Sequence, residues 1–548
     1  MAIVTFKMKD FGIDNVAETA EKLGLDVEEV SGDSISIDIS PNRPDLLDFF
    51  GLRRAMLHYT GHKTPNESDY KITNVAETSI TVTKNVSKVR PYISAFVVKG
   101  IKLSEQQLKY LINFTEKLSE TYGRKRRKMA LGLHNYDVIK GPLVYDASKT
   151  GKFVPLGMEK EMSFDEIIKS HPKGVAFGST VSAGKGNGGV LYPFLKDSEK
   201  ILSMIPIINS SATAIDKNTH NLLVDVTGTS ETTVRGTASL LASSFADQGG
   251  EIFPVEIKYT KSSAMQPDMS YREIKVNLNK IDGTLGFRFT ESLLITYANR
   301  MGYPASKYGN SLLVKVPPYR MDVFNYQDVI EDMAIGFGYE NIKPIPLRSA
   351  SVGFPGELQE YSNRLAVFMI GLGYSEAMNN YLTNEDISFR QMLQNVEQDI
   401  VSIEYSKTEN ITMLRSAILP LLLQDLSRSA HEKMPQRLFE IGSVFSVSND
   451  KAVEKVNLSF VEEHSRSNFA DIKSVLSSVL SFLGIKYTLK EESNPSFIEG
   501  RCAGVFVDGK RTGVIGEVHP AVLDNFKIAE PVVACELTLI GEVSYFNK

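Results

Sequence analysis

The sequence predicts a multidomain α+β protein. Its 548 residues exceed what one hydrophobic core holds, and they correspond to roughly three to five domains of the usual size. Strand-like segments with alternating apolar residues and helix-like segments with helical periodicity follow one another along the chain. Apolar residues make up 42% and charged residues 23%, which is typical of a globular protein and argues against a disordered or fibrous one.

The charge, the cysteines and the apolar runs exclude further classes of protein. Because the formal net charge is −5, any nucleic-acid binding must be local. Cys502 and Cys535 have no metal-ligand spacing and form no disulfide framework, so we expect structural thiols in a reducing compartment. The start MAIVTFKMKDFG has no basic-then-apolar leader, and the best apolar run (417–423) is short and contains Pro420. We therefore expect a cytoplasmic protein that does not enter a membrane.

The first domain is expected over about residues 1–85. In SISIDIS (34–40) isoleucine alternates with polar residues, which predicts a half-buried strand. PNRPD then ends the strand, and we expect Asp45 to cap the following helix and Gly61 to end it.

The second and third domains are expected over about residues 90–260 and 268–346. LLVDVTGT (222–229) is the clearest inner strand of the second domain. The third domain is predicted to contain a helix at about 291–301 and the strand SLLVKVPP (311–318).

The fourth domain, at about residues 350–548, mixes long helices with strands. RLFEIGSVF (437–445) predicts a strand, and DIKSVLSSVLSFLG (471–484) predicts an amphipathic helix that ends at its glycine. AGVFVDGKRTGVIGEV (503–518) predicts a hairpin that turns at Asp508-Gly509.

Acidic residues gather in YRMDVFNYQDVIEDMAIGFGYENI (319–342). On a helical wheel Asp328, Glu331 and Asp332 share the face opposite the apolar residues, and like charges at this spacing repel by about a few tenths of a kcal/mol per pair. A cation would remove this cost. Carboxylate oxygens suit Mg²⁺ or Ca²⁺, and Asp322 could fold back as a further ligand. The alternative is a solvated face whose acidic residues complement the helix macrodipole.

A basic run and a polar cluster follow each other in the second domain. Five consecutive cations in an acidic protein form a local patch suited to phosphate, although such runs are often merely solvated. The next segment places His134, Asn135 and Asp137 between apolar stretches, where a histidine could orient a substrate or a water molecule, or serve a structural hydrogen bond. The five cations are Arg124, Lys125, Arg126, Arg127 and Lys128.

Phosphate-loop and covalent chemistry are not supported. In GKGNGG (184–189) a glycine follows Lys185 where a phosphate loop needs Ser or Thr, so we expect a flexible loop. The sequence contains no Gly-x-Ser-x-Gly elbow and no cysteine in a nucleophile setting.

Four segments resemble the β subunit of phenylalanyl-tRNA synthetase in its archaeal and eukaryotic form. They are SPNRPDLLDFFGLRRA (40–55), RPYISAFVVKGI (90–101), LVDVTGT (223–229) and, above all, the acidic segment 319–342. The acidic helix followed by GFGYENI is a specific motif of that family, and SPNRPD is moderately specific. The resemblance covers essentially the whole chain, and the length fits the shorter archaeal type.

The resemblance implies four modules. They are an N-terminal B1-like module at 1–85, a B3/B4 editing domain at 90–260, a winged-helix-like B5 domain at 268–346, and a class II synthetase-like core at 350–548. This core is expected to be catalytically inactive and to serve assembly, because RLFE (437–440) is only a weak echo of the ATP-binding arginine motif and no glycine-rich segment ends in a second arginine.

The resemblance also implies a metal and partners. Asp322, Asp328, Glu331 and Asp332 match the positions that bind Mg²⁺ shared with the α subunit. The α subunit would activate phenylalanine with ATP and charge tRNAPhe, while this chain scaffolds an (αβ)₂ heterotetramer.

Editing is the second expected activity. By analogy with other hydrophobic pockets, a phenylalanine pocket rejects tyrosine only about a hundredfold, so mischarged tyrosyl-tRNAPhe must be hydrolysed. The resemblance implies that the B3/B4 domain does this with a positioned water. By position we expect His134 and Asn135 near the ester or the terminal adenosine. The expected polar groups of the pocket are Asn209, Ser210, Ser211 and Thr227, with strand-end hydrogen bonding as the alternative for Asn209 and Thr227.

Two other functions remain open at this point. The first is a stand-alone aminoacyl-tRNA deacylase or RNA-binding protein, which the length and the class II-like half argue against. The second is an assembly scaffold without editing activity.

Overall fold

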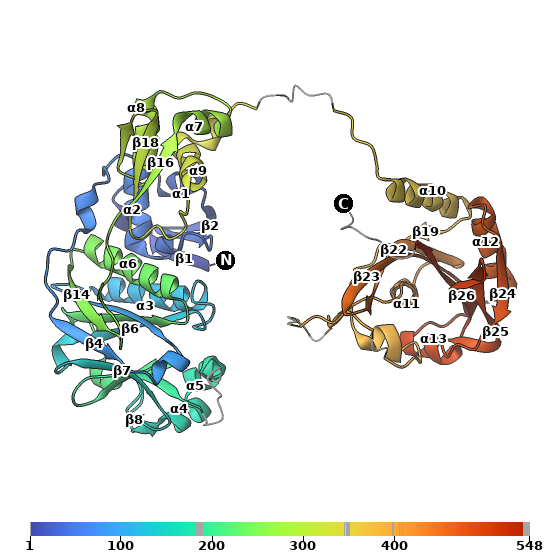
Figure 1. Cartoon of the computed structure of the whole chain (residues 1–548), viewed down its shortest axis with the longest axis horizontal. Helices are drawn as coiled ribbons and strands as arrows, with labels where there is room; N and C mark the ends of the chain where they lie inside the picture. The colour runs from blue at the N-terminus through green and yellow to red at the C-terminus, as the bar shows by residue number, and fades with distance from the viewer. Residues whose placement is uncertain are drawn as a thin grey trace. The chain divides into compact units, whose positions relative to one another are not determined.

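The protein, represented by a computed structural model, consists of two compact units, Met1–Pro346 and Leu347–Lys548 (Figure 1). The structure describes residues 2–181, 190–344, 346, 351–396, 399–404, 406, 408 and 410–540, so the glycine-rich stretch 184–189 lies outside the described residues. Both units combine helices with sheets, which confirms the multidomain α+β prediction.

The first unit begins with a small antiparallel sheet of order β1-β3-β2. β3 (Ser34–Ile39) buries its isoleucines and confirms the predicted strand; β1 is Ala2–Lys7 and β2 is Asp26–Ser31. Two helices follow the first and third strands, α1 (Val16–Lys22) and α2 (Phe49–Tyr59).

The cap of α2 differs from the prediction. Asp48, and not Asp45, accepts a hydrogen bond from the Gly51 backbone N–H at 3.1 Å. PNRPD continues into a 3-10 helix, Pro44–Leu47, which delays the start of α2 by one turn. Asp45 is buried there and is paired with Arg43 at 2.8 Å.

Asp48 makes the stability of this unit depend on pH. Burial raises the pKa of Asp48 to about 6, although hydrogen bonds from Ser244 and Gly51 oppose the shift. Because the native pKa lies above the unfolded value, the native state loses stability relative to the unfolded chain as pH rises from about 4 through 6. We expect Asp48→Asn to raise the apparent free energy of unfolding at pH 8 by about 2 kcal/mol, and to change it little near pH 4, in urea titrations. The exposed Asp14→Asn is the control, and an equal effect of both variants would contradict this account.

The middle of the first unit is a ten-stranded sheet of order β12-β11-β10-β7-β4-β14-β5-β13-β6, with β15 paired to β14. β13 lies between β5 and β6, antiparallel to both, and all its residues are buried, which confirms the predicted inner strand. The bounds are β4 Thr78–Val82, β5 Tyr92–Lys99, β6 Met129–Asn135, β7 Leu143–Ser148, β10 Tyr192–Lys196, β11 Ile201–Met204, β12 Ile208–Asn209, β13 Leu222–Gly228, β14 Glu251–Lys258 and β15 Ser263–Gln266.

Helices pack against parts of this sheet. α6 (Glu231–Asp247) packs on β5 and β13, and α3 (Glu105–Glu120) packs on β6. α4 (Phe164–Ser170) and α5 (Pro172–Phe177) lie beside the short ribbon of β8 (Lys152–Phe153) and β9 (Met162–Ser163) (Figure 1).

The last part of the first unit is a three-stranded sheet of order β16-β18-β17 with three helices. Helix α8 and strand β18 confirm the two predicted elements. The bounds are β16 Arg272–Asn277, β17 Ala305–Tyr308, β18 Ser311–Val316, α7 Leu278–Leu285, α8 Glu291–Arg300 and α9 Tyr326–Phe337.

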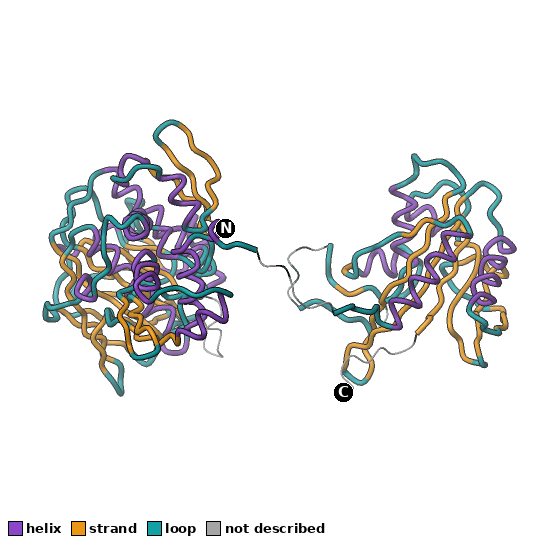
Figure 2. The backbone as a smooth tube through the Cα atoms, turned by 90° about the horizontal axis from the view of Figure 1, so that it is seen from above, coloured by secondary structure: helices purple, strands orange, loops and turns teal. Residues whose placement is uncertain are grey.

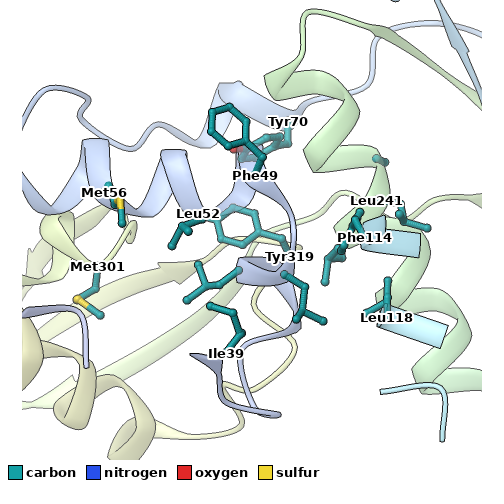
Figure 3. Packing of buried hydrophobic residues seen from close by; sticks show 14 of the residues in the cluster. Ile39, Phe49, Leu52, Met56, Tyr70, Phe114, Leu118, Leu241, Met301 and Tyr319 are labelled. Atoms are coloured by element: carbon teal, nitrogen blue, oxygen red, sulfur yellow. The ribbon is translucent and has the colours of Figure 1, made fainter. Parts of the chain in front are cut away.

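One hydrophobic core joins these three parts of the first unit. Figure 3 shows Ile39 and Leu52 from the N-terminal part, Phe114 and Leu241 from the helices on the large sheet, and Tyr319 from the segment before α9 in one cluster. The three parts therefore share apolar contacts, while the large sheet has two further apolar clusters of its own, one around Ile80 and Leu223 and one around Phe164.

The second unit is built on a seven-stranded sheet of order β19-β22-β23-β27-β26-β25-β24. One face packs against α10 and α12, and the other against α11 and α13, so helices flank the strands (Figure 2). The bounds are β19 Ser375–Glu376, β22 Gln436–Ser448, β23 Lys451–Glu463, β24 Tyr487–Glu491, β25 Phe497–Val507, β26 Lys510–Val518, β27 Val532–Ile540, α10 Glu357–Gly371, α11 Leu419–Arg428, α12 Phe469–Phe482 and α13 Pro520–Phe526.

The second unit contains the local elements that the sequence predicts. β22 and α12 cover the predicted strand and helix, and β25 and β26 turn at Asp508 and Gly509, whose φ values of 49° and 77° suit a two-residue hairpin.

Candidate functional site

A cavity of about 220 Å³ lies against the large sheet of the first unit, beside β6 and β13. Its apolar wall comes from β6 and from the segment 203–208, which includes Met204, Ile207 and Ile208. Polar side chains also line the cavity, among them Asp225 and Thr227 on β13 and Asn209 on β12. The cavity can therefore hold an apolar group and hydrogen-bond a polar group attached to it.

Asp225 is the buried carboxylate of the cavity, whose lining also includes Glu116. It is only 2% exposed, and its Oδ2 lies 3.1 Å from His134 Nε2. Because a carboxylate oxygen accepts, the Nε2–H of His134 is the donor. On the other side of the ring, His134 Nδ1 lies 2.9 Å from Thr213 Oγ1. His134 is fully buried behind the cavity wall and is not among the lining residues, so it positions Asp225.

Sequence reasoning missed Asp225, although a signal was present. An acidic residue in the middle of a fully buried strand needs a partner or a function, because an unpaired buried charge is very costly. LLVDVTGT contains such a residue, and the partner lies on the adjacent strand β6, 91 positions away in the sequence.

Thr227 and Asn209, which the sequence predicts for the pocket, both line the cavity. Arg90 donates from Nε to Thr227 Oγ1 at 3.1 Å and from Nη2 to Thr227 O at 2.8 Å. Burial lowers the pKa of Arg90 to about 10, so Arg90 stays charged at neutral pH. Asn209 Nδ2 donates to Leu133 O at 3.1 Å, which leaves its amide oxygen as the acceptor.

The other three predicted residues do not line the cavity. Asn135 Oδ1 accepts from the backbone N–H of Asp137 at 3.1 Å, and Ser210 Oγ accepts from the backbone N–H of Ala212 at 3.2 Å. The Ser211 backbone N–H donates to a strand-end carbonyl at 2.9 Å. These contacts order the ends of strands, and direct roles for the three residues stay predictions.

The basic run forms a tight turn after α3 that divides into an inner and an outer part. Arg126 is the inner residue: its Nη1 donates to Pro206 O at 3.1 Å and to Ile207 O at 2.9 Å, and its side chain lines the cavity. Arg124, Lys125 and Arg127 are exposed, while Lys128 lies 5.2 Å from the centre of the Tyr122 ring. The turn thus combines a cavity wall with an exposed positive surface.

Comparison with known proteins decides the family. Residues 75–246, 274–339 and 344–539 match the models of the B3/4 domain, the tRNA synthetase B5 domain and the phenylalanyl tRNA synthetase beta chain CLM domain. The phenylalanine–tRNA ligase beta subunit of Archaeoglobus fulgidus is 36% identical over 530 residues, which are 96% of this chain and 95% of that protein. The chain belongs to the phenylalanyl-tRNA synthetase beta-subunit family.

Two further similarities agree with this assignment. The phenylalanine–tRNA ligase beta subunit of Methanococcoides burtonii is 33% identical and covers 98% of this chain and 100% of that protein. An N-terminal fragment of the phenylalanyl-tRNA synthetase beta subunit from Pyrococcus horikoshii superposes with a TM-score of 0.58 at 28% identity, over 61% of this chain and 99% of the fragment. The cavity thus lies in the B3/4 part of a beta subunit.

The acidic segment lies in the B5 part, where Arg320 is its centre. Arg320 is 2% exposed and donates two hydrogen bonds to Asp322, at 2.9 and 2.7 Å, and one to Asp332 at 2.6 Å. Tyr303 donates a further hydrogen bond to Asp332. Burial would raise the pKa of Asp322, but the Arg320 charge and hydrogen bonds outweigh it and lower that pKa.

The other two acidic residues have different surroundings. Asp328 Oδ2 accepts from the backbone N–H groups of Phe324 at 2.6 Å and Asn325 at 2.8 Å, which closes the capping box of α9. Glu331 is exposed. Asp332, by contrast, is buried, so the four carboxylates do not form one solvated face.

In this arrangement the four acidic residues do not form a preformed Mg²⁺ coordination site. No group of three or more His, Cys, Asp or Glu side chains is placed to hold a metal ion in the described part of the chain. Mg²⁺ prefers near-octahedral oxygen ligands, whereas Arg320 already binds Asp322 and Asp332. As placed here, the four residues do not fit the ion as one donor set, and their Mg²⁺ site stays a prediction.

None of the helices in the described ranges is long and apolar enough to cross a bilayer.

Proposed function

We propose that this chain is the β subunit of a phenylalanine–tRNA ligase that edits its own errors. A class II α subunit would charge tRNAPhe with phenylalanine, using ATP and Mg²⁺ at its own site, in an (αβ)₂ heterotetramer in the cytoplasm. The β chain would hydrolyse mischarged tyrosyl-tRNAPhe in the B3/4 cavity. The observation that carries the editing proposal is the buried Asp225 carboxylate in the wall of this cavity, beside apolar side chains of β6 and of the segment 203–208.

Asp225 gives the cavity a means of distinguishing tyrosine from phenylalanine. Its carboxylate accepts hydrogen bonds, and the phenolic O–H of tyrosine donates one. Phenylalanine has no donor at this position, so the carboxylate would keep only its hydrogen bond from His134. A site built to hydrogen-bond a substrate group rejects an analogue that lacks it far more strongly than an apolar pocket rejects an added hydroxyl.

The hydrolysis would use a positioned water molecule. The two ring nitrogens of His134 contact Asp225 and Thr213, so among the described residues no Ser or Cys is hydrogen-bonded to His134 as a nucleophile. The amide oxygen of Asn209 remains to accept a hydrogen bond from that water or from a ribose hydroxyl. Thr227 is held by Arg90 and shapes the same wall.

The tRNA would reach the cavity along the basic turn. Arg124, Lys125 and Arg127 are exposed cations on this turn, and Arg126 on the same turn lines the cavity. Phosphate contacts position a nucleic acid without reading its sequence, so this surface would direct the acceptor end toward the site.

Gly132 offers a steric test of this site. A Cβ atom at Gly132 would collide with Asp225 Oδ2 and lie 3.0 Å from His134 Nε2. We therefore expect Gly132→Ala to displace the carboxylate and to lower tyrosyl-tRNAPhe hydrolysis by about tenfold or more, in a deacylation assay. Gly283→Ala is the matched control, because its Cβ would meet no atom within 4 Å. Equal rates for the two variants would place the reacting group elsewhere.

The whole proposal is tested by purifying the chain with a tag from its own host. Equal copies of a class II α subunit, at a mass that fits two of each, together with hydrolysis of preformed tyrosyl-tRNAPhe, are the expected results. A chain that is purified alone and clears tyrosyl-tRNA would instead be a stand-alone deacylase. A complex that charges tRNAPhe but leaves tyrosyl-tRNAPhe intact would be a scaffold without editing.

A further inference from the structure

The second unit contains a cavity of its own, of about 420 Å³, on the face of the sheet that packs against α11. Its lining side chains come from β23, β26 and β27, from the start of α11 and from the segments 388–394 and 494–497. The volume lies within the range of roughly 300–1,000 Å³ that small-molecule sites occupy. None of its lining residues belongs to the editing cavity, and the proposed function does not use it.

A row of polar side chains crosses the sheet beneath this cavity. Lys455 and Asn457 are two residues apart on β23 and therefore point to the same face. Asn457 pairs with Thr538 on the neighbouring strand β27, and Glu536 precedes Thr538 by two residues on that same face. All four line the cavity, which gives this part of the core an unusual polarity for a sheet covered by a helix.

Glu536 is held firmly in this row. Its carboxylate accepts from the backbone N–H of Ile418 at 3.0 Å, from that of Leu419 at 2.8 Å, and from Asn457 Nδ2 at 2.7 Å. The first two donors belong to the start of α11, so the carboxylate ties that helix to the sheet. These contacts fix the orientation of the Asn457 amide, because the reversed amide would place its oxygen against a carboxylate oxygen.

The amide oxygen of Asn457 is consequently left without a partner. Asn457 is only 7% exposed, and its Oδ1 has no hydrogen-bond donor within the described part of the chain. A buried acceptor without a donor is costly, and native proteins satisfy nearly all such groups with protein, water or ligand. The cavity that Asn457 lines is the place from which a donor could reach it.

Lys455 provides a charge beside that acceptor. Its ammonium group makes no ion pair among the described side chains, whereas Arg511, the other cation of the cavity, is bound to Glu492 by hydrogen bonds of 2.8 and 2.6 Å. Lys455 is half-buried, so an anion that binds it would be partly desolvated. The cavity thus presents the unpaired acceptor Asn457 Oδ1 and the unpaired Lys455 ammonium group, two residues apart on β23.

We propose that this cavity binds a small metabolite that carries both an anionic group and an N–H donor, with its amine on Asn457 Oδ1 and its anionic group on Lys455. Phe389 and Phe497 form an apolar wall for the remainder of the ligand. Two sources have this chemistry, an α-amino acid with its ammonium and carboxylate, and a nucleoside monophosphate with its exocyclic amine and phosphate.

Equilibrium binding to the full-length chain tests the proposal, with L-phenylalanine and AMP as the probes. One of them should bind, and its analogue without the amine should bind at least about tenfold more weakly. These analogues are 3-phenylpropionate and purine riboside 5′-monophosphate, and the probe that binds identifies the source. Lys455→Met should weaken binding of that probe by at least about tenfold, because the stem of the side chain remains while its charge is lost.

Matched variants make the outcome decisive. Lys451→Met removes an exposed lysine four residues earlier on β23 and should change the affinity by less than about twofold. Asn457→Leu, of similar size, should abolish the preference for the probe that carries the amine. If this change at a buried residue disturbs folding, the Lys455→Met variant still tests the proposal. Failure of both probes to bind at millimolar concentration, or binding that Lys455→Met leaves unchanged, would overturn the proposal. Neither result would bear on editing in the first unit.

Discussion

Asp225→Asn is expected to slow the hydrolysis of tyrosyl-tRNAPhe by about 10- to 100-fold and to leave the charging of tRNAPhe with phenylalanine nearly unchanged. Asparagine keeps the size of the side chain, and its amide oxygen can still accept from His134 Nε2. It loses the charge that strengthens a hydrogen bond to the tyrosyl hydroxyl, and hydrogen bonds to charged groups contribute about 1.5–3 kcal/mol. Single-turnover deacylation of preformed tyrosyl-tRNAPhe by the complex with the α subunit measures the effect.

Asp137→Asn is the matched control for this experiment. Asp137 is an exposed carboxylate three residues from His134, and it does not line the cavity. We expect the Asp137 variant to hydrolyse tyrosyl-tRNAPhe at the wild-type rate. Unchanged hydrolysis in Asp225→Asn would show that another group recognises the tyrosyl hydroxyl. Loss of both charging and hydrolysis would indicate that Asp225 supports the fold and not the substrate.

Arg320→Met is expected to destabilise the first unit by about 3–5 kcal/mol. Methionine fills part of the space but leaves Asp332 buried with Tyr303 alone, and Asp322 without its two charge-assisted hydrogen bonds. Removing one partner of a buried ion pair is costly, because the other charge stays desolvated. The thermal midpoint of the first unit should fall by at least about 4 °C in calorimetry.

The control for Arg320 is Arg288→Met in the same part of the chain. The Arg288 side chain is 90% exposed and lies 3.4 Å from Asp282, so its loss should change the midpoint by less than about 1 °C.

The same calorimetry tests the predicted magnesium site. If Mg²⁺ alone raises the midpoint of the isolated wild-type chain by several degrees, the ion competes successfully with Arg320 for these carboxylates. No shift would mean that the ion needs oxygen ligands from a partner.

Local patterns predicted much of the fold because they report burial directly. Alternating isoleucines identified β3, a mainly apolar run that contains Asp225 identified β13, and Asp-Gly between two strand-like segments identified the β25–β26 hairpin. In each of these elements the pattern of residue types lies within a few consecutive positions, so a short window of sequence contains it.

The candidate site was less predictable because its partners come from distant segments. A helical wheel places Asp332 with Glu331, yet Asp332 is buried because Arg320 and Tyr303 lie beside it. His134 and Asp225 likewise meet only after β6 and β13 pair. A wheel or a strand pattern describes one element, so it cannot show which second element supplies the countercharge.

The apolar core that joins the three parts of the first unit makes them one folding unit. Contacts run from the N-terminal sheet through the helices on the large sheet to the segment before α9. Amide hydrogens of β13, beside the B3/4 cavity, and of α9, which carries the acidic residues, should therefore exchange with solvent through a common opening event. A destabilising change near Arg320 would then increase exchange in β13 as well, so damage to the acidic segment would also shorten the lifetime of the folded B3/4 cavity.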